Sequence, residues 1–317
     1  MLERISGEHA LAVRMHLGYN NNEQTGMSVL SIGYSIRNRS RQMYERHWNL
    51  SLKPFQNDFD PQMFFPSAMH EEALTRLLYA FSEEKGLMLL TGPPGAGKSY
   101  VARIFAGECE RRGVASAYVG IPDSDPLELI VQIGRAYGLA FEHREKYRMI
   151  DTLVSHILSN SGGRGLLVLD EVQDLREPRC LEEVRLLTSL THGHRRIFTI
   201  ILVGGQSMRE FILKDEALAS RIEIAHNLQG LNVEETIRYV TQRLEYAGRR
   251  ETVFSPDALE AMHSMTGGLP RLLNTLCDFS LFAAAGRKLE WVGLEVVEEA
   301  RAEIGHFMPT RAMEANL

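Results

Sequence analysis

Cysteine is scarce in this sequence: 317 residues contain three, Cys109, Cys180 and Cys277. They lie far apart and form no C-x-x-C pair, which argues against a zinc site or a disulfide framework and favours a reducing cytoplasm. Long apolar runs are also missing, because the longest one, IFTIILV at 197–203, is far shorter than the roughly 20 residues of a membrane-spanning helix. The first residues are too polar for a signal peptide. We therefore expect a cytoplasmic protein with no direct membrane span.

The sequence has no excess of positive charge, since 35 Lys and Arg stand against 41 Asp and Glu, for a net charge of -6. This balance argues against a protein that coats nucleic acid by bulk charge, although a local basic face stays open. With 44% hydrophobic and 24% charged residues, the composition is typical of a soluble globular protein of two or three domains.

Three segments differ in their residue patterns. Residues 1–42 have little apolar periodicity and contain the polar run YNNNEQTG, so we expect a poorly ordered extension. Residues 43–231 are predicted to form an α/β nucleotide-binding domain, and residues 232–317 a small helical domain. The start of the α/β domain is rich in aromatic residues and proline, which predicts an irregular segment packed near the nucleotide. Ser67 is then a candidate helix cap.

Short apolar runs alternate with amphipathic stretches between residues 88 and 228. The runs MLLTG, ASAYVG, LLVLDEV, FTIILVGG and IEIAHNL are the predicted strands, and this alternation is typical of a parallel sheet with crossover helices. From about residue 232 the strand signal disappears and four helical patterns follow. Gly248, Gly267 and Gly286 stand where three of these helices should end.

A glycine-rich octet, GPPGAGKS, follows the first predicted strand and precedes a predicted helix. It satisfies the pattern G-x-x-x-x-G-K-[ST], in which glycines allow backbone N–H groups to face phosphates at a helix N-terminus. Lys98 would neutralise the β and γ oxygens, and the Ser99 hydroxyl would bind Mg2+. We assign nucleotide binding to the octet and the next residue: Gly92, Pro93, Pro94, Gly95, Ala96, Gly97, Lys98, Ser99 and Tyr100.

Two carboxylates, Asp170 and Glu171, end the apolar run LLVL. Such a pair is expected at the carboxyl end of a buried parallel strand beside a phosphate loop. Asp170 would hold Mg2+ through water, and Glu171 would polarise the attacking water, which P-loop kinases do not need. The alternative is a pair of solvated acids. The number of residues between the phosphate loop and this pair argues against that alternative.

Three further residues are candidates for nucleotide sensing. Gln206 follows the strand at 198–203 and is placed to sense the γ-phosphate. Arg271, in GLPR, begins a helix of the small domain and could report nucleotide state to it. Arg221, just before the last strand, could act across a subunit interface as an arginine finger. The alternatives are a structural glutamine and two solvated surface arginines.

Two other clusters are weaker candidates. His192 and His194, in THGHRR, resemble a metal pair, but no further ligand stands nearby. Arg37, Arg39 and Arg41 form a small basic cluster that could touch phosphates. For both clusters we favour a solvated surface or tail over a site.

Together these motifs resemble the AAA+ ATPases, and more closely the general secretion pathway protein A (ExeA-like) group. The resemblance covers about 43–301 and rests on TGPPGAGKS, LLVLDEVQDL, ILVGGQ, ASRIEI and GGLPRLLNTLCDF. It implies a sheet of order 5-1-4-3-2 with a helical lid, ATP and Mg2+ as cofactors, and the residue roles given above. It also implies a homo-oligomer, a ring or filament and plausibly a hexamer, that acts on a protein partner the sequence does not identify. Gln173 matches the group's DEAQ box.

The sequence departs from that group in two places. Gly204-Gly205-Gln206 has one glycine more than the usual V-G-Q, and neither a transmembrane helix nor a peptidoglycan-binding domain follows the lid. TniB-like and MuB-like transposition ATPases share the core without an anchor. We therefore hold two hypotheses: an ATPase that drives assembly or remodelling of a secretion-pathway-like complex, and an ATP-gated adaptor that binds double-stranded DNA and recruits a transposase. A small-molecule P-loop kinase is a third and weaker alternative.

Overall fold

The computed structural model describes residues 44–160, 162–175, 177–251 and 253–305. The predicted extension, 1–42, and the basic cluster within it lie outside the described residues. None of the helices in the described ranges is long and apolar enough to cross a membrane.

Five parallel strands form the main sheet: β1 (Leu87–Thr91), β2 (Ala115–Val119), β3 (Gly165–Leu169), β6 (Phe198–Gly204) and β7 (Ile222–Asn227). Their order is β2-β3-β6-β1-β7. Numbered along the chain and read from the other edge, this is 5-1-4-3-2, which confirms the predicted order. The three inner strands are buried along their whole length, whereas β7 at one edge alternates in exposure.

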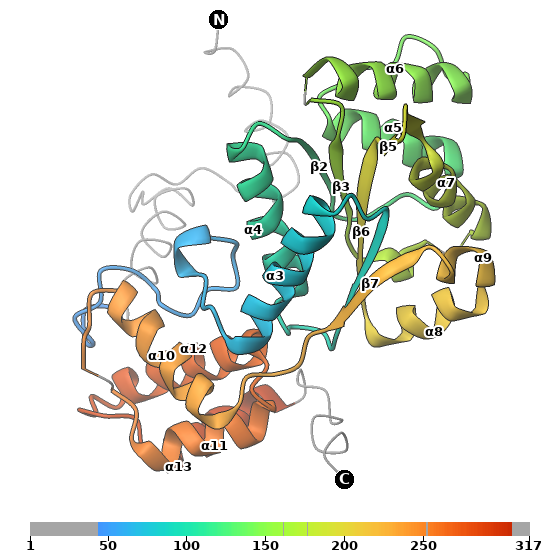
Figure 1. The fold of residues 1–317 in the computed structure, drawn as a ribbon. Coiled ribbons are helices and arrows are strands. Elements are labelled where there is room, and N and C mark those ends of the chain that lie inside the picture. The colour runs from blue at the N-terminus through green and yellow to red at the C-terminus, as the bar shows by residue number, and fades with distance from the viewer. Residues whose placement is uncertain (1–43, 161, 176, 252, 306–317) are drawn as a thin grey trace, which may run out of the picture. The chain divides into compact units, whose positions relative to one another are not determined.

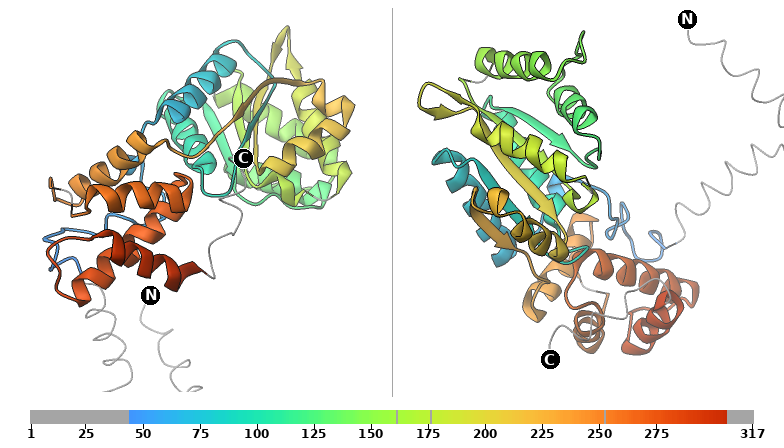
Figure 2. Two further views of the ribbon diagram at one scale, coloured as in Figure 1. Left: turned by 90° about the horizontal axis from the view of Figure 1, so that it is seen from below. Right: turned by 90° about the vertical axis from the view of Figure 1, so that its right-hand side faces the viewer.

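Helices cover both faces of this sheet (Figures 1 and 2). Alternate residues of each strand point to opposite faces, so Leu90 and Leu89 enter different cores. One core is formed with α3 (Ala68–Ser82) and α4 (Lys98–Arg111), which lie on one face. The helices of the other core are α5 (Pro126–Ala136), α6 (Lys146–Asn160), α7 (Pro178–Ser189), α8 (Gln206–Lys214) and α9 (Glu216–Ala219).

Four helices follow the sheet and form what we call the lid: α10 (Val233–Tyr246), α11 (Pro256–Thr266), α12 (Pro270–Gly286) and α13 (Leu294–Ile304). Their ends follow the predicted signals. Gly267 ends α11 with a φ of 60°, Gly248 has a φ of 94° just after α10, and Gly286 is the last residue of α12.

The aromatic segment that precedes α3 packs into the lid. Tyr44, Trp48 and Phe55 are buried in the same core as α10–α13, and the Trp48 indole Nε1 donates to Leu281 O at 3.0 Å. In Figure 1 this segment, in blue, runs from the lid to α3 through the short 3-10 helix η1 (Pro61–Met63). The predicted α/β domain includes this segment, whereas its core contacts associate residues 44–55 with the lid.

A short hairpin, β4 (Thr191–His192) and β5 (Arg195–Arg196), carries the histidine pair. His192 and His194 are exposed, and across the described ranges no group of three or more His, Cys, Asp and Glu side chains could hold a metal.

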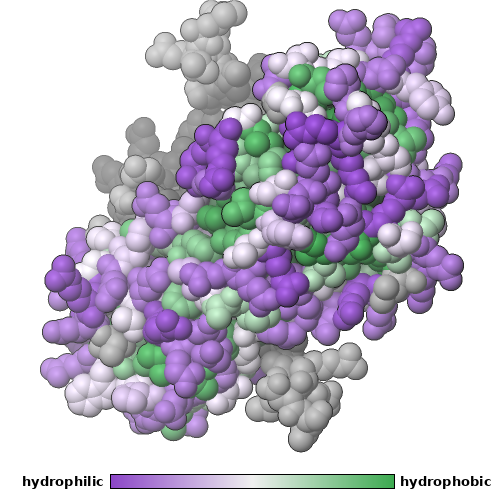
Figure 3. Space-filling model, in the orientation of Figure 1, coloured by the Kyte–Doolittle hydropathy of each residue, from purple (hydrophilic) through white to green (hydrophobic). Residues whose placement is uncertain are grey.

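Hydrophilic side chains cover much of the face seen in Figure 3, with smaller hydrophobic areas between them.

Candidate nucleotide-binding site

The glycine-rich loop joins β1 to α4 and lines a cavity of about 560 Å³, within the range of roughly 300–1,000 Å³ for small-molecule sites. Of the nine residues assigned to nucleotide binding, six line it: Pro94, Gly95, Gly97, Lys98, Ser99 and Tyr100. The loop ends at Gly97, and α4 begins at Lys98, so the first N–H groups of α4 face the same space.

Two glycines of the loop are required by close neighbours as well as by backbone conformation. Gly95 has a φ of 85°, and a Cβ there would lie 2.8 Å from Cβ of Arg271 in the lid. Gly97 has a φ of 92°, and a Cβ there would lie 2.7 Å from Nε2 of His70. The loop is therefore held between α12 and α3, and a side chain at either glycine would push one of them away.

His70 supports the loop from α3, a role that the sequence analysis did not assign. Its Nε2 donates to Ala96 O at 3.0 Å, so Nδ1 accepts from the Ser67 hydroxyl at 2.5 Å. Ser67 also caps α3 as predicted, by accepting from His70 N. Burial lowers the pKa of His70, although its hydrogen bond to Ala96 opposes that effect. The only sequence signal was a histidine three residues after a capping serine.

Lys98 is 8% exposed, and its ammonium contacts the backbone of the loop. Its Nζ donates to Gly92 O and to Pro93 O, each at 3.0 Å. Burial lowers the pKa of Lys98, while the nearby Glu171 and Asp170 carboxylates act in the opposite direction. The charge of Lys98 is therefore directed at the loop interior, beside the two acids.

Asp170 follows the carboxyl end of β3 and is 3% exposed. One carboxylate oxygen accepts from the Glu171 backbone N–H at 2.9 Å, and the other accepts from the Tyr118 hydroxyl on the neighbouring strand β2. Burial, and then the hydrogen bond to Asp170, raise the pKa of Tyr118. Asp170 is thus held in place by two donors, as is usual for a carboxylate placed to bind a metal.

Glu171 adopts a left-handed backbone, with a φ of 52°, that is uncommon for a residue with a side chain. Its Oε2 accepts from Nε2 of Gln173, and Oε1 of Gln173 accepts from Gly205 N at 3.1 Å. Glu171, Gln173 and Gly205 all line the cavity. One amide side chain therefore connects the end of β3 to the end of β6.

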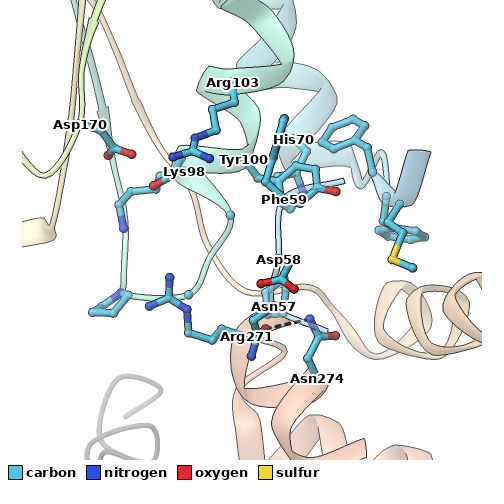
Figure 4. A pocket seen from close by; sticks show the side chains of 18 of the residues that line it. Asn57, Asp58, Phe59, His70, Lys98, Tyr100, Arg103, Asp170, Arg271 and Asn274 are labelled. Atoms are coloured by element: carbon cyan, nitrogen blue, oxygen red, sulfur yellow. Dashed lines mark hydrogen bonds between the residues drawn. The ribbon is translucent and has the colours of Figure 1, made fainter. Parts of the chain in front are cut away.

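The lid closes the opposite side of the cavity (Figure 4). Arg271, the second residue of α12, points toward the phosphate loop in Figure 4, and its backbone N–H donates to Gly95 O at 3.3 Å. The helix predicted to start in GLPR is therefore present as α12, and its first turn contacts the phosphate loop, while the role of Arg271 toward the nucleotide stays a prediction.

A hydrogen-bonded chain extends the lid wall away from the phosphate loop. The buried Arg243 guanidinium donates to the Tyr239 hydroxyl from Nε at 3.1 Å and from Nη2 at 2.9 Å. The Tyr239 hydroxyl donates to Asn274 Oδ1 at 2.7 Å, and Asn274 Nδ2 donates to Asn57 Oδ1 at 2.9 Å. All four side chains line the cavity, so this wall offers fixed polar groups.

Aromatic rings form the wall next to the first turn of α4. The Tyr100 ring packs against Phe59 at 4.9 Å between centroids and is stacked with Phe64 at 6.0 Å. Arg103 lies over the rings of Phe59 and Tyr118, at 5.4 and 4.6 Å from their centroids. Flat, apolar walls of this kind suit the base of a nucleotide.

Two predicted residues are placed outside the lining of the cavity. Gln206 is exposed at the first position of α8 and is not among the described residues that line the cavity. The glutamine that does line the cavity is Gln173. The Arg221 guanidinium lies against the end of α7, where Nη1 donates to the Ser189 hydroxyl at 2.5 Å and the Thr188 hydroxyl at 3.2 Å. Their roles stay predictions.

The donor set at the base of the loop fits a magnesium nucleotide. The Ser99 hydroxyl lines the same cavity as the Asp170 and Glu171 carboxylates. Mg2+ prefers oxygen ligands and is commonly bound by one or two side chains together with phosphates. A hydroxyl and a buried, oriented carboxylate next to a loop for phosphates meet that requirement.

Comparison with known proteins agrees with this geometry. Residues 82–212 match the family model for the AAA domain. General secretion pathway protein A of Aeromonas hydrophila is 32% identical over 77% of this chain, which spans 45% of that relative's length. In fold, the chain is similar to Cdc6p from Pyrobaculum aerophilum, with a TM-score of 0.62, 18% identity and coverage of 77% of this chain and 71% of that one.

The chain is also similar in fold to the Aeropyrum pernix ORC1 protein in complex with DNA, with a TM-score of 0.60, 21% identity and coverage of 79% of this chain and 68% of that one. These structural likenesses concern the fold alone. Together with the phosphate loop, the strand order and the lid, the matches show that the chain belongs to the AAA+ proteins and is related to general secretion pathway protein A.

Proposed function

We propose that this protein binds ATP with Mg2+ and hydrolyses it to ADP and phosphate, and that turnover drives nucleotide-dependent oligomerisation and the assembly or remodelling of a partner complex. One observation carries the proposal: Lys98, Glu171 and Arg271 come from three elements and line a single cavity. A cation for phosphate, an acid for water and a lid arginine are the groups that ATP hydrolysis and its readout need.

Within this proposal each residue has one role, supported by its position at the cavity. Lys98 neutralises the β and γ oxygens, while the Ser99 hydroxyl and Asp170 hold the metal, which counters charge on the phosphates. Glu171 takes a proton from the attacking water. Arg271 responds to the phosphates and transmits nucleotide state to the lid through α12 and its contact with Gly95.

Gln206 and Arg221 complete the proposal at the level of the assembly. Gln206 senses the γ-phosphate after movement of the β6–α8 turn, and Arg221 acts as an arginine finger in the cavity of a neighbouring chain. The assembly in this proposal is a homo-oligomeric ring or filament in the cytoplasm, with a hexamer as the favoured ring. Because general secretion pathway protein A is a relative, a secretion-pathway-like complex is the partner we favour.

Two variants test the chemistry. Lys98→Ala should abolish ATP binding measured by calorimetry, because the triphosphate charge is then uncompensated. Glu171→Gln should bind ATP normally and release phosphate at least ~100-fold more slowly, the scale expected for loss of a positioned base. Unchanged ATP affinity in the first variant, or a wild-type rate in the second, would overturn these assignments.

A mixing experiment tests the assembly. Glu171→Gln has an intact Arg221, and Arg221→Ala has an intact Glu171, so some interfaces of a mixed assembly contain both groups. Activity should reappear on mixing two inactive proteins. If light scattering shows co-assembly and the mixture stays inactive, Arg221 is not the finger. If the wild-type protein stays monomeric with ATP and its specific activity is independent of concentration, the assembly proposal fails.

A second candidate function is an ATP-gated adaptor that binds double-stranded DNA and recruits a transposase. The likeness to a structure described as a complex with DNA is the observation in its favour. Stimulation of the ATPase rate by double-stranded DNA, with binding that weakens steeply as salt rises, would favour the adaptor. An ATPase indifferent to DNA would favour the secretion-like role. Phosphate transfer to a small molecule would point to the kinase alternative.

A further inference from the structure

The amide of Gln173 bridges Glu171, after β3, and Gly205, after β6. It donates to Oε2 of Glu171 and accepts from the backbone N–H of Gly205. Only one orientation of the amide satisfies both partners, because an ionised carboxylate can only accept a hydrogen bond and a backbone N–H can only donate one. The side chain is therefore locked at both ends, although it lies at the surface of the cavity.

The last residue of β6, Gly204, leaves room for this side chain. A Cβ at Gly204 would lie 2.9 Å from Oε1 of Gln173 and 3.1 Å from Cβ of Met208. The absence of a side chain at Gly204 thus leaves room for the amide to reach the Gly205 N–H.

We infer that Gln173 is a positioning residue for hydrolysis: it fixes the Glu171 carboxylate through Oε2 and leaves Oε1 as the oxygen that takes the proton from water. The left-handed backbone of Glu171 gives its side chain little support from a regular element, so a side-chain contact has to orient it. The same amide connects the base to Gly205, the residue that precedes Gln206 at the start of α8. This inference rests on the proposed function, since Glu171 needs orienting only if it activates water.

Two variants of Gln173 and one of Gly204 test this role. Gln173→Ala should lower kcat about 10-fold or more and leave KM nearly unchanged, because a hydrogen bond to a charged group is lost and no group that holds the nucleotide is touched. Gln173→Glu keeps the length of the side chain but cannot donate to Glu171, so it should lose at least as much. Gly204→Ala should show the same loss by displacing the amide. Asp174→Ala, in the same 3-10 turn, is the matched control and should keep the wild-type kcat.

Combination with the base gives the sharpest test. In a Glu171→Gln background there is no carboxylate to orient, so adding Gln173→Ala should change the single-turnover rate less than 2-fold, in contrast to its effect in the wild type. Likewise, Gly204→Ala should add little to Gln173→Ala.

Each outcome has one meaning. If the wild type hydrolyses ATP and Gln173→Ala has the same kcat, a higher kcat, or a loss in KM alone, the inference is wrong and the proposed function stands. Additive losses in the Glu171→Gln background would also overturn it, because Gln173 would then act by another route. If the wild type itself has no ATPase activity, the proposed function fails and the inference fails with it.

Discussion

The contact between His70 and the phosphate loop makes a quantitative prediction for Gly97→Ala in the protein without nucleotide. The new Cβ would lie 2.7 Å from His70 Nε2, at a backbone φ of 92°. A left-handed conformation costs a residue with a side chain about 1–2 kcal/mol. Displacement of His70 removes its hydrogen bond to Ala96 O and leaves buried polar groups unpaired, at about 1–3 kcal/mol.

The expected destabilisation of Gly97→Ala is therefore about 2–5 kcal/mol, which corresponds to a fall in Tm of roughly 4–20 °C. Gly107→Ala, in the same helix α4, is the matched control, because a Cβ there has nothing within 4 Å. Replacing glycine in a helix interior should raise stability by about 0.5–1 kcal/mol. Thermal and urea unfolding followed by circular dichroism measure both effects.

A His70→Ala background separates the two contributions to this effect. Without the imidazole, Gly97→Ala should lose only the backbone part, about 1–2 kcal/mol, so the two substitutions should be strongly non-additive. Equal destabilisation in both backgrounds would show that His70 is not the group displaced. If Gly97→Ala were no less stable than Gly107→Ala, the phosphate loop would not be packed tightly against His70 of α3.

Three further predictions use other contacts. Because burial lowers the pKa of His70, its neutral form stabilises the fold above about pH 6.5, and this contribution is lost as the pH falls. His70→Gln should therefore reduce the fall in Tm between about pH 7.5 and 5.5. An equal dependence of Tm on pH in the variant and the wild type would refute this. Tyr118→Phe removes a donor to Asp170 and should raise the Mg2+ concentration for half-maximal ATPase activity about 10-fold, with Tyr147→Phe, at an exposed position, as the control. Trp48→Ala should destabilise the protein by about 3–5 kcal/mol, whereas Trp291→Ala, at 64% exposure, should be nearly neutral; similar effects would refute the placement of Trp48 in the lid core.

The sequence predicted the parts of this fold that depend on local patterns. The apolar strands, the GPPGAGKS loop and the acidic pair after β3 are each contained in a few neighbouring residues, and parallel strands bring their carboxyl ends to one edge. The strand order came from resemblance, because no periodicity states which strand lies beside which.

The contacts missed by the sequence analysis join residues that are distant along the chain. His70 and Ala96 are 26 positions apart, and Gln173 and Gly205 are 32 apart. Tyr44, whose hydroxyl donates to Asp278, is 234 positions from its partner. Such pairs depend on the packing of whole elements, and polar side chains such as His70 and Gln173 give no periodic signal that would indicate their partners.

The two arginines that the sequence predicts to sense nucleotide have different surroundings in the structure. Arg271 lies in the same cavity as the phosphate loop of its own chain, and its backbone contact with Gly95 ties any movement of α12 to that loop. Arg221 is held by hydroxyls at the end of α7 and is not among the described residues that line the cavity. Arg271 can therefore act on a nucleotide bound to its own chain, whereas Arg221 would act on the γ-phosphate of a nucleotide bound to a neighbouring chain. Loss of Arg271 should accordingly weaken nucleotide binding even in the monomer, and loss of Arg221 should be visible only in the assembled protein.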